Sequence, residues 1–112
     1  MDDWHKLISV FPEYGRLLSE AGVRTARLVY PSGESEGLVL TEKSYGEQCG
    51  AVVAEASLFC RGGQLVLQCR ISRSAAGNRG WNGGSRGYAP KSAAEAAKIT
   101  LAYFAQARQI LS

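Results

Sequence analysis

The chain has 112 residues, of which 46% are hydrophobic and 21% charged, and its formal net charge is +3. This length and composition are typical of a globular protein with a modest core, so we predict a single domain over residues 1–112. No apolar run approaches the roughly 20 residues that a membrane-spanning helix requires. The N-terminal segment is acidic where a signal peptide would be basic. These features predict a cytoplasmic protein with no membrane partner.

The charges are divided unequally along the chain. Residues 1–55 hold five Lys or Arg against nine Asp or Glu, whereas residues 56–112 hold eight against one. A strongly basic segment indicates an anionic partner, although a solvated surface also accounts for such charges. We therefore expect any surface for an anionic macromolecule to lie in the C-terminal half.

Residues 3–21 carry the spacing of an amphipathic helix, and Gly22 stands where a helix commonly ends. Pro12 interrupts this pattern, because proline lacks an N–H and restricts the residue before it. We predict one kinked helix or two short helices, with Asp2 or Asp3 as the first cap. The stripe expected to face the core is Trp4, Leu7, Ile8, Phe11, Tyr14, Leu17, Leu18 and Ala21.

A first hairpin is predicted from residues 23–30 and 37–41. Both segments are rich in β-forming residues, and Pro31, Ser32 and Gly33 between them are strong turn residues. Residues 42–48 are mostly polar, and we expect them to form a loop.

A second hairpin is predicted over residues 51–71. Its two halves alternate apolar side chains, as strands with one buried face do, and the sequence RGGQ between them is typical of a tight turn. The alanines and Glu55 also permit a helix over residues 51–60, so that choice stays open, but the turn favours a strand. The alternating positions are Val52, Ala54, Ala56, Leu58, Cys60, Leu65, Leu67, Cys69 and Ile71.

The last helix is predicted over residues 93–110, because Ser92 and Glu95 form the S-x-x-E pattern of a capping box. Its alanines permit a close approach to the sheet or to a second copy of the helix, so a homodimer stays open. The predicted fold is α+β: an N-terminal helical segment, a four-stranded antiparallel sheet and a long C-terminal helix packed on one face. The positions expected to face the sheet are Ala94, Ala97, Leu101, Phe104 and Ala105.

The sequence offers no set of catalytic or metal-binding residues. His5 is the single histidine, and acid–base or nucleophilic catalysis needs partners that no nearby motif supplies. Cys49, Cys60 and Cys69 have no metal-ligand spacing, so we expect them to be reduced and buried. Pro90 stands where a phosphate-binding P-loop has a glycine before its lysine. We predict that the protein is not an enzyme and holds no cofactor or metal.

The candidate binding site is the segment from Arg73 to Lys91, which we predict to be a flexible, glycine-rich loop before the last helix. Arginine and lysine attract phosphates, and aromatic rings stack on unpaired bases. Trp81 also fits a structural role in which it folds back onto the sheet. The candidate phosphate contacts are Arg73, Arg79, Arg86 and Lys91, and the candidate stacking residues are Trp81 and Tyr88.

The run GGSRGYAPKSAAEAAKITLA resembles the basic loop and alanine-rich final helix of double-stranded RNA-binding domains. The order of helix, antiparallel strands and helix is similar as well, and the resemblance implies phosphate contacts by Lys91 and Lys98. It is confined to the C-terminal part of the chain. Glu95 stands where such a domain favours a basic residue, and we expect four strands instead of three, so we do not infer membership.

We predict a small non-enzymatic protein that binds nucleic acid or a nucleoprotein complex through the basic segment. The alternative is a protein-binding inhibitor from a phage or mobile element, of the anti-CRISPR kind, that blocks a host defence complex. The small size, the lack of a catalytic set and the oppositely charged halves are compatible with that alternative.

Overall fold

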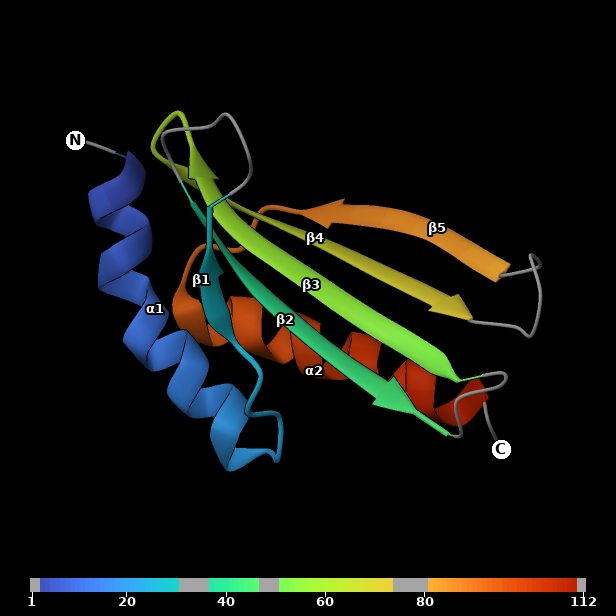
Figure 1. Ribbon diagram of the computed structural model, residues 1–112. Coiled ribbons are helices and arrows are strands. Elements are labelled where there is room, and N and C mark those ends of the chain that lie inside the picture. The colour runs from blue at the N-terminus through green and yellow to red at the C-terminus, as the bar shows by residue number, and fades with distance from the viewer. Residues whose placement is uncertain (1–2, 31–36, 47–50, 74–80, 111–112) are drawn as a thin grey trace.

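The computed structural model describes residues 3–30, 37–46, 51–73 and 81–110, with side chains from residue 85 onward in the last range. The elements are α1 (Asp3–Glu20), β1 (Arg27–Val29), β2 (Leu38–Tyr45), β3 (Val52–Arg61), β4 (Gln64–Arg73), β5 (Trp81–Tyr88) and α2 (Ala93–Ile110). The strands form one antiparallel sheet in chain order, with the helices beside it (Figure 1). The predicted α+β class is confirmed, but the predicted four strands are wrong, because the described residues form a sheet of five.

The core lies between one face of the sheet and both helices. β3 and β4 bury every second residue, and these residues join the buried side chains of α1 and α2 in one cluster. Residues 52–60 therefore lie in a strand, as the turn that follows them favoured. Gly62 and Gly63 form the turn with φ angles of 60° and 78°, a region that glycine enters without steric cost.

Helix α1 continues through Pro12 as one 18-residue element. Of the two alternatives, two short helices are therefore wrong, because the chain forms one helix through this position. Pro12 and Ile8, whose carbonyl loses its intrahelical donor, are both exposed, so water can replace the missing hydrogen bond. Leu7, Tyr14 and Leu18 are the fully buried residues of the predicted stripe, and Ile8 faces solvent.

The end of α1 is set by Gly22, as predicted. Gly22 has a φ of 89°, and the N–H of Val23 donates to the carbonyl of Leu18 at 2.8 Å. This is the six-to-one hydrogen bond of a Schellman cap, in which the residue after the glycine also packs on the helix. Val23 is buried, so the cap also anchors the chain before β1.

Strand β1 is shorter than predicted and β2 is longer. Thr25 accepts a hydrogen bond from the N–H of Glu42 at 3.3 Å, so a side chain takes the place of a strand partner before β1. β2 continues to Tyr45 because residues 42–45 pair with β3, and ladder hydrogen bonds do not depend on side-chain polarity. The loop prediction is therefore wrong for residues 42–45, while residues 47 and 48 and the turn at 31–33 lie outside the described residues.

Helix α2 is turned relative to the predicted orientation. Ala97 and Phe104 are buried as expected, but Ala94 and Ala105 are exposed. A helix places residues three and four apart on one face, and the stripe that contacts the sheet starts one residue earlier than predicted. Its buried members are Ala93, Ala96, Ala97, Thr100, Phe104 and Ala107.

The start of α2 has the predicted cap. The N–H of Glu95 donates to Ser92 Oγ at 3.1 Å, as in an N-cap. The Glu95 carboxylate accepts from the N–H of Lys91 at 3.4 Å, one residue before the donor of a standard capping box. Ser92 therefore accepts from a backbone N–H in the first turn of the helix, and Glu95 accepts from a backbone N–H that precedes the helix.

We expect Ser92→Ala to lower the free energy of unfolding by about 0.5–2 kcal/mol, because the N–H of Glu95 loses its acceptor. Urea denaturation followed by circular dichroism measures the difference. Ser92→Asp is the matched control, since its carboxylate can accept the same hydrogen bond. Equal denaturation midpoints for wild type and Ser92→Ala would contradict a stabilising cap.

The β3–β4 turn is tied to the first turn of α1. Asp3 accepts hydrogen bonds from the N–H of Gly63 at 2.7 Å and of Gly62 at 3.0 Å, and Lys6 donates to the carbonyl of Gly63. The hydrogen bond from Gly63 is the largest cause that lowers the pKa of Asp3 below its ordinary value. Asp3 therefore connects the sheet to the helix, in addition to lying at the helix start.

We expect Asp3→Asn to lower the melting temperature at pH 7 and to lower it less at pH 3. A carboxylate whose folded pKa is depressed stabilises the fold above its unfolded pKa, and this contribution is lost as the pH falls through the folded pKa. Thermal melts at the two pH values measure the change. Glu13→Gln is the control, because Glu13 is an exposed carboxylate of the same helix. If the difference in melting temperature between wild type and Asp3→Asn were as large at pH 3 as at pH 7, the charge of Asp3 would have no stabilising role.

The sheet face opposite the helices carries two ion pairs among the described residues. Arg27 contacts Glu42 and Arg70 contacts Glu55, each at 3.0 Å. Glu42 and Glu55 are opposite each other in the β2–β3 register, so each arginine also offsets repulsion between the two carboxylates. Exposed pairs contribute about 0–1 kcal/mol each. Arg70 therefore already has a carboxylate partner within the protein.

Candidate functional site

The segment predicted to be a flexible loop contains strand β5. Residues 81–88 pair with β4 at the end of the sheet. The prediction of a flexible loop is wrong for these residues, because they pair with β4. As an edge strand, β5 needs hydrogen bonds from this one neighbour. The glycines of β5 have low strand propensity, and its pairing with β4 compensates for that.

A bulge interrupts the pairing of β5 with β4. Between the pairs Arg70–Ser85 and Ser72–Asn82, β5 contains one residue more than β4. The extra residue falls at Gly83 and Gly84, and bulges at sheet edges commonly use glycine and re-aim the side chains around them. The glycines that suggested a loop therefore shape an irregular strand.

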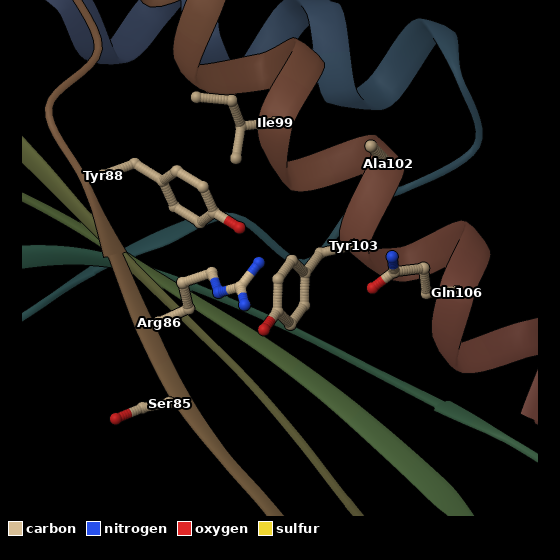
Figure 2. Close-up of a pocket in the computed structure, with 7 residues that line it drawn as sticks. All are labelled: Ser85, Arg86, Tyr88, Ile99, Ala102, Tyr103 and Gln106. Atoms are coloured by element: carbon tan, nitrogen blue, oxygen red, sulfur yellow. The ribbon is translucent and has the colours of Figure 1, made fainter.

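Arg86 and Tyr88 lie on the helix side of the sheet. Arg86 is opposite Cys69 and Tyr88 is opposite Leu67 in the register, and both partners are buried beneath the helices. Because opposed residues share a face, Arg86 and Tyr88 point toward α2. Figure 2 shows the guanidinium of Arg86 reaching toward the ring of Tyr103 from α2.

These side chains line an open pocket of about 580 Å³ between β5 and α2. The α2 residues of the pocket are spaced as one helical stripe, next to the stripe that packs on the sheet. Tyr88 and Tyr103 meet edge to face with ring centroids 6.3 Å apart. The residues that line the pocket, which we call the β5–α2 pocket, are Ser85, Arg86, Tyr88, Ile99, Ala102, Tyr103 and Gln106.

The β5–α2 pocket is rich in hydrogen-bond donors. Arg86 is exposed, and its side chain forms no hydrogen bond or ion pair with any residue that the structure describes. Burial raises the pKa of the Tyr103 hydroxyl, Tyr88 raises it further and Arg86 opposes the rise, so at neutral pH the hydroxyl keeps its proton and can donate. Gln106 adds an amide. None of the lining residues is acidic, and such a site suits an anionic group.

The remaining predicted site residues are not all brought together. Lys91 is exposed just before α2, three positions along the chain from Tyr88. Arg73 is exposed at the end of β4 and is opposite Trp81 in the register, away from Arg86 along the same pair of strands. Arg79 and the side chain of Trp81 lie outside the described residues, so their predicted contacts stay predictions.

Sequence reasoning missed the contribution of α2 to the pocket. Neither Tyr103 nor Gln106 was among the candidate binding residues. Their spacing of three residues placed both on one helix face, but only the position of β5 shows that this face borders Arg86.

No cluster of three or more His, Cys, Asp or Glu residues suited to a metal ion occurs within the described ranges. His5 is exposed. Cys60 and Cys69 are buried, and burial raises the pKa of the Cys69 thiol to about 11, so its reactive thiolate is scarce at neutral pH. Cys49 lies outside the described residues. None of the described helices is long and apolar enough to cross a membrane.

Comparisons of the chain with protein-family models, with curated proteins and with solved structures found no match.

Proposed function

We propose that the protein binds nucleic acid, alone or in a nucleoprotein complex, through the β5–α2 pocket and the adjoining start of α2. The observation that carries this proposal is Arg86, an arginine without a carboxylate partner among the described residues, beside two tyrosine rings in a pocket with no acidic residue. A phosphate group would accept hydrogen bonds from Arg86, and bases would contact the rings.

The charges near the pocket support the proposal. Lys91 is exposed just before α2 and Lys98 is exposed in its first half, where both would add attraction to a phosphate backbone. Arg70 lies on the opposite face and is paired with Glu55, so it does not contribute a free cation. The hydrogen bond of Glu95 to the backbone near the helix start disfavours an anion there, so we assign the phosphate contacts to side chains instead of the helix N-terminus.

We expect the double variant Arg86→Ala/Lys91→Ala to bind nucleic acid more weakly and with a shallower salt dependence. Each phosphate contact that is lost reduces the slope of log K against log salt by about 0.7 for single strands and 0.9 for duplexes. A salt titration of fluorescence anisotropy, with a labelled 20-nucleotide single strand and its duplex, measures the slopes. Thermal melts check folding, and exposed substitutions usually change stability by no more than about 0.5 kcal/mol.

The matched control is Arg16→Ala/Arg24→Ala, which removes the same number of positive charges. Arg16 is exposed within α1, and Arg24 is exposed after it. This variant tests whether net charge alone explains the loss. Equal slopes for the two double variants would contradict a phosphate contact at the β5–α2 pocket. Failure of the wild-type protein to bind either probe at low salt would reject the proposed function.

A protein partner is the second candidate, and the sheet edge favours it. Within the described residues no strand pairs with the outer edge of β5, so an extended segment of another protein could add to the sheet there. This candidate includes an inhibitor that blocks a host complex. Capture of a partner that survives nuclease treatment, together with no binding to either probe, would favour it over nucleic acid.

A further inference from the structure

We infer that the β5–α2 pocket takes one unpaired nucleotide, with its phosphate on Arg86, its base against Tyr103 and a base edge at Gln106. The inference rests on the proposed function and specifies its substrate class as single-stranded nucleic acid. The observation that carries it is that a guanidinium, a tyrosine ring and an amide line the same pocket (Figure 2). They are contributed by β5 and α2, two separate elements of the chain.

The size and lining of the pocket suit a nucleotide better than a phosphate alone. Small-molecule sites generally occupy about 300–1,000 Å³, and this pocket has about 580 Å³. A phosphate needs only the donors of Arg86 and its neighbours. The remainder of the lining includes Ile99 and Ala102, apolar side chains that a flat base can cover.

The tyrosines leave a ring face for the base. Tyr88 and Tyr103 are inclined at 77°, and in an edge-to-face pair one ring covers a single face of the other. A base in a duplex is already stacked on both sides, so only an unpaired base can use such a ring. The pocket therefore predicts a preference for single strands over duplexes.

Gln106 gives the pocket a means to distinguish bases. Its amide presents a donor and an acceptor together, the pattern that pairs with N6 and N7 of adenine. The other polar lining groups include a guanidinium and phenolic hydroxyls, which do not provide this paired pattern. The corresponding edge of thymine offers an acceptor and a methyl group, so for a base that presents this edge to Gln106 we expect adenine to be favoured over thymine.

The test compares binding of the wild type, Tyr103→Ala and Gln106→Leu to labelled dA20, dT20 and the dA20·dT20 duplex in fluorescence anisotropy. Tyr103→Ala should weaken binding to the single strands by about 5- to 150-fold, since loss of one stacked base costs about 1–3 kcal/mol, and should change duplex binding little. Gln106→Leu should remove the preference for dA20 over dT20 without changing the salt slope.

Two control variants separate the site from general effects. Tyr103→Phe keeps the ring and should retain most single-strand affinity. Gln109→Leu changes an exposed amide of the same helix that does not line the pocket, and should leave the preference for dA20 intact. If Tyr103→Ala proves unfolded in thermal melts, the exposed Gln106 still provides the decisive comparison.

Each outcome separates the inference from the proposed function. Suppose that the wild type binds single strands and duplex equally and that Gln106→Leu keeps the wild-type preference between dA20 and dT20. This result would overturn the inference of an unpaired nucleotide in the pocket while leaving nucleic-acid binding in place. Wild-type protein that binds none of the three probes would overturn both. Selective loss of single-strand affinity in Tyr103→Ala, with Gln109→Leu unchanged, would support the inference.

Discussion

Replacing Phe104 by alanine should lower the free energy of unfolding by about 3–5 kcal/mol, the usual cost of truncating a buried phenylalanine. Phe104 is 2% exposed and is among the largest fully buried side chains of the core. Its removal loses the transfer free energy of the ring and leaves a cavity that close-packed neighbours fill only in part. Because domains of this size have a total stability of about 5–15 kcal/mol, we expect the variant to be marginally folded. Urea denaturation at 25 °C measures the loss.

Ile110→Ala is the control for Phe104→Ala. Ile110 belongs to the same helix but is 39% exposed, so its truncation should cost much less. A loss below about 1 kcal/mol in Phe104→Ala would contradict the position of α2 on the sheet, because an exposed ring has little burial energy to lose.

Enlarging Ala96 to leucine is expected to destabilise the fold by about 1–3 kcal/mol, although leucine is a good helix former. Ala96 is 0% exposed, and Ala54 and Ala56 of β3 are equally buried in the same core cluster. Small side chains on both elements allow the helix to lie close to the sheet, and a leucine would force them apart or adopt a strained rotamer.

The matched control is Ala105→Leu, the same substitution at an exposed position in the middle of α2. It should change the free energy of unfolding by no more than about 0.5 kcal/mol. Denaturant titration of both variants gives the comparison. If Ala96→Leu were as stable as Ala105→Leu, the close packing of helix against sheet would be wrong, and the orientation of α2 with it.

The orientation of α2 decides which of its side chains line the β5–α2 pocket, the site of the proposed function. Phe104 and Tyr103 are adjacent in the sequence, yet Phe104 belongs to the buried stripe and Tyr103 to the β5–α2 pocket. A rotation of the helix by one residue would remove Tyr103 from the pocket. Substitutions in the core that turn the helix are therefore expected to reduce binding even where the protein stays folded.

Local patterns in the sequence were sufficient for several parts of the fold. The alternation in residues 51–71 and the two glycines of the turn predicted β3, β4 and the hairpin between them. Gly22 and Ser92 predicted the end of one helix and the start of another. These features depend on neighbours a few residues away, through the strand period, the left-handed conformation of glycine or a capping hydrogen bond.

The tertiary structure decided the features that depend on distant partners. The glycine-rich segment of β5 has weak strand propensity and becomes ordered as a strand by pairing with β4, while α1 passes through Pro12 because the affected turn faces solvent. The pocket joins Arg86 to Tyr103 and Gln106 through the packing of α2 beside the sheet edge. The sequence showed that Arg86 and Tyr88 were candidates, but it did not show what lies opposite them. Such a contact depends on strand register and helix rotation, and a shift of one residue in either turns a different side chain toward the site.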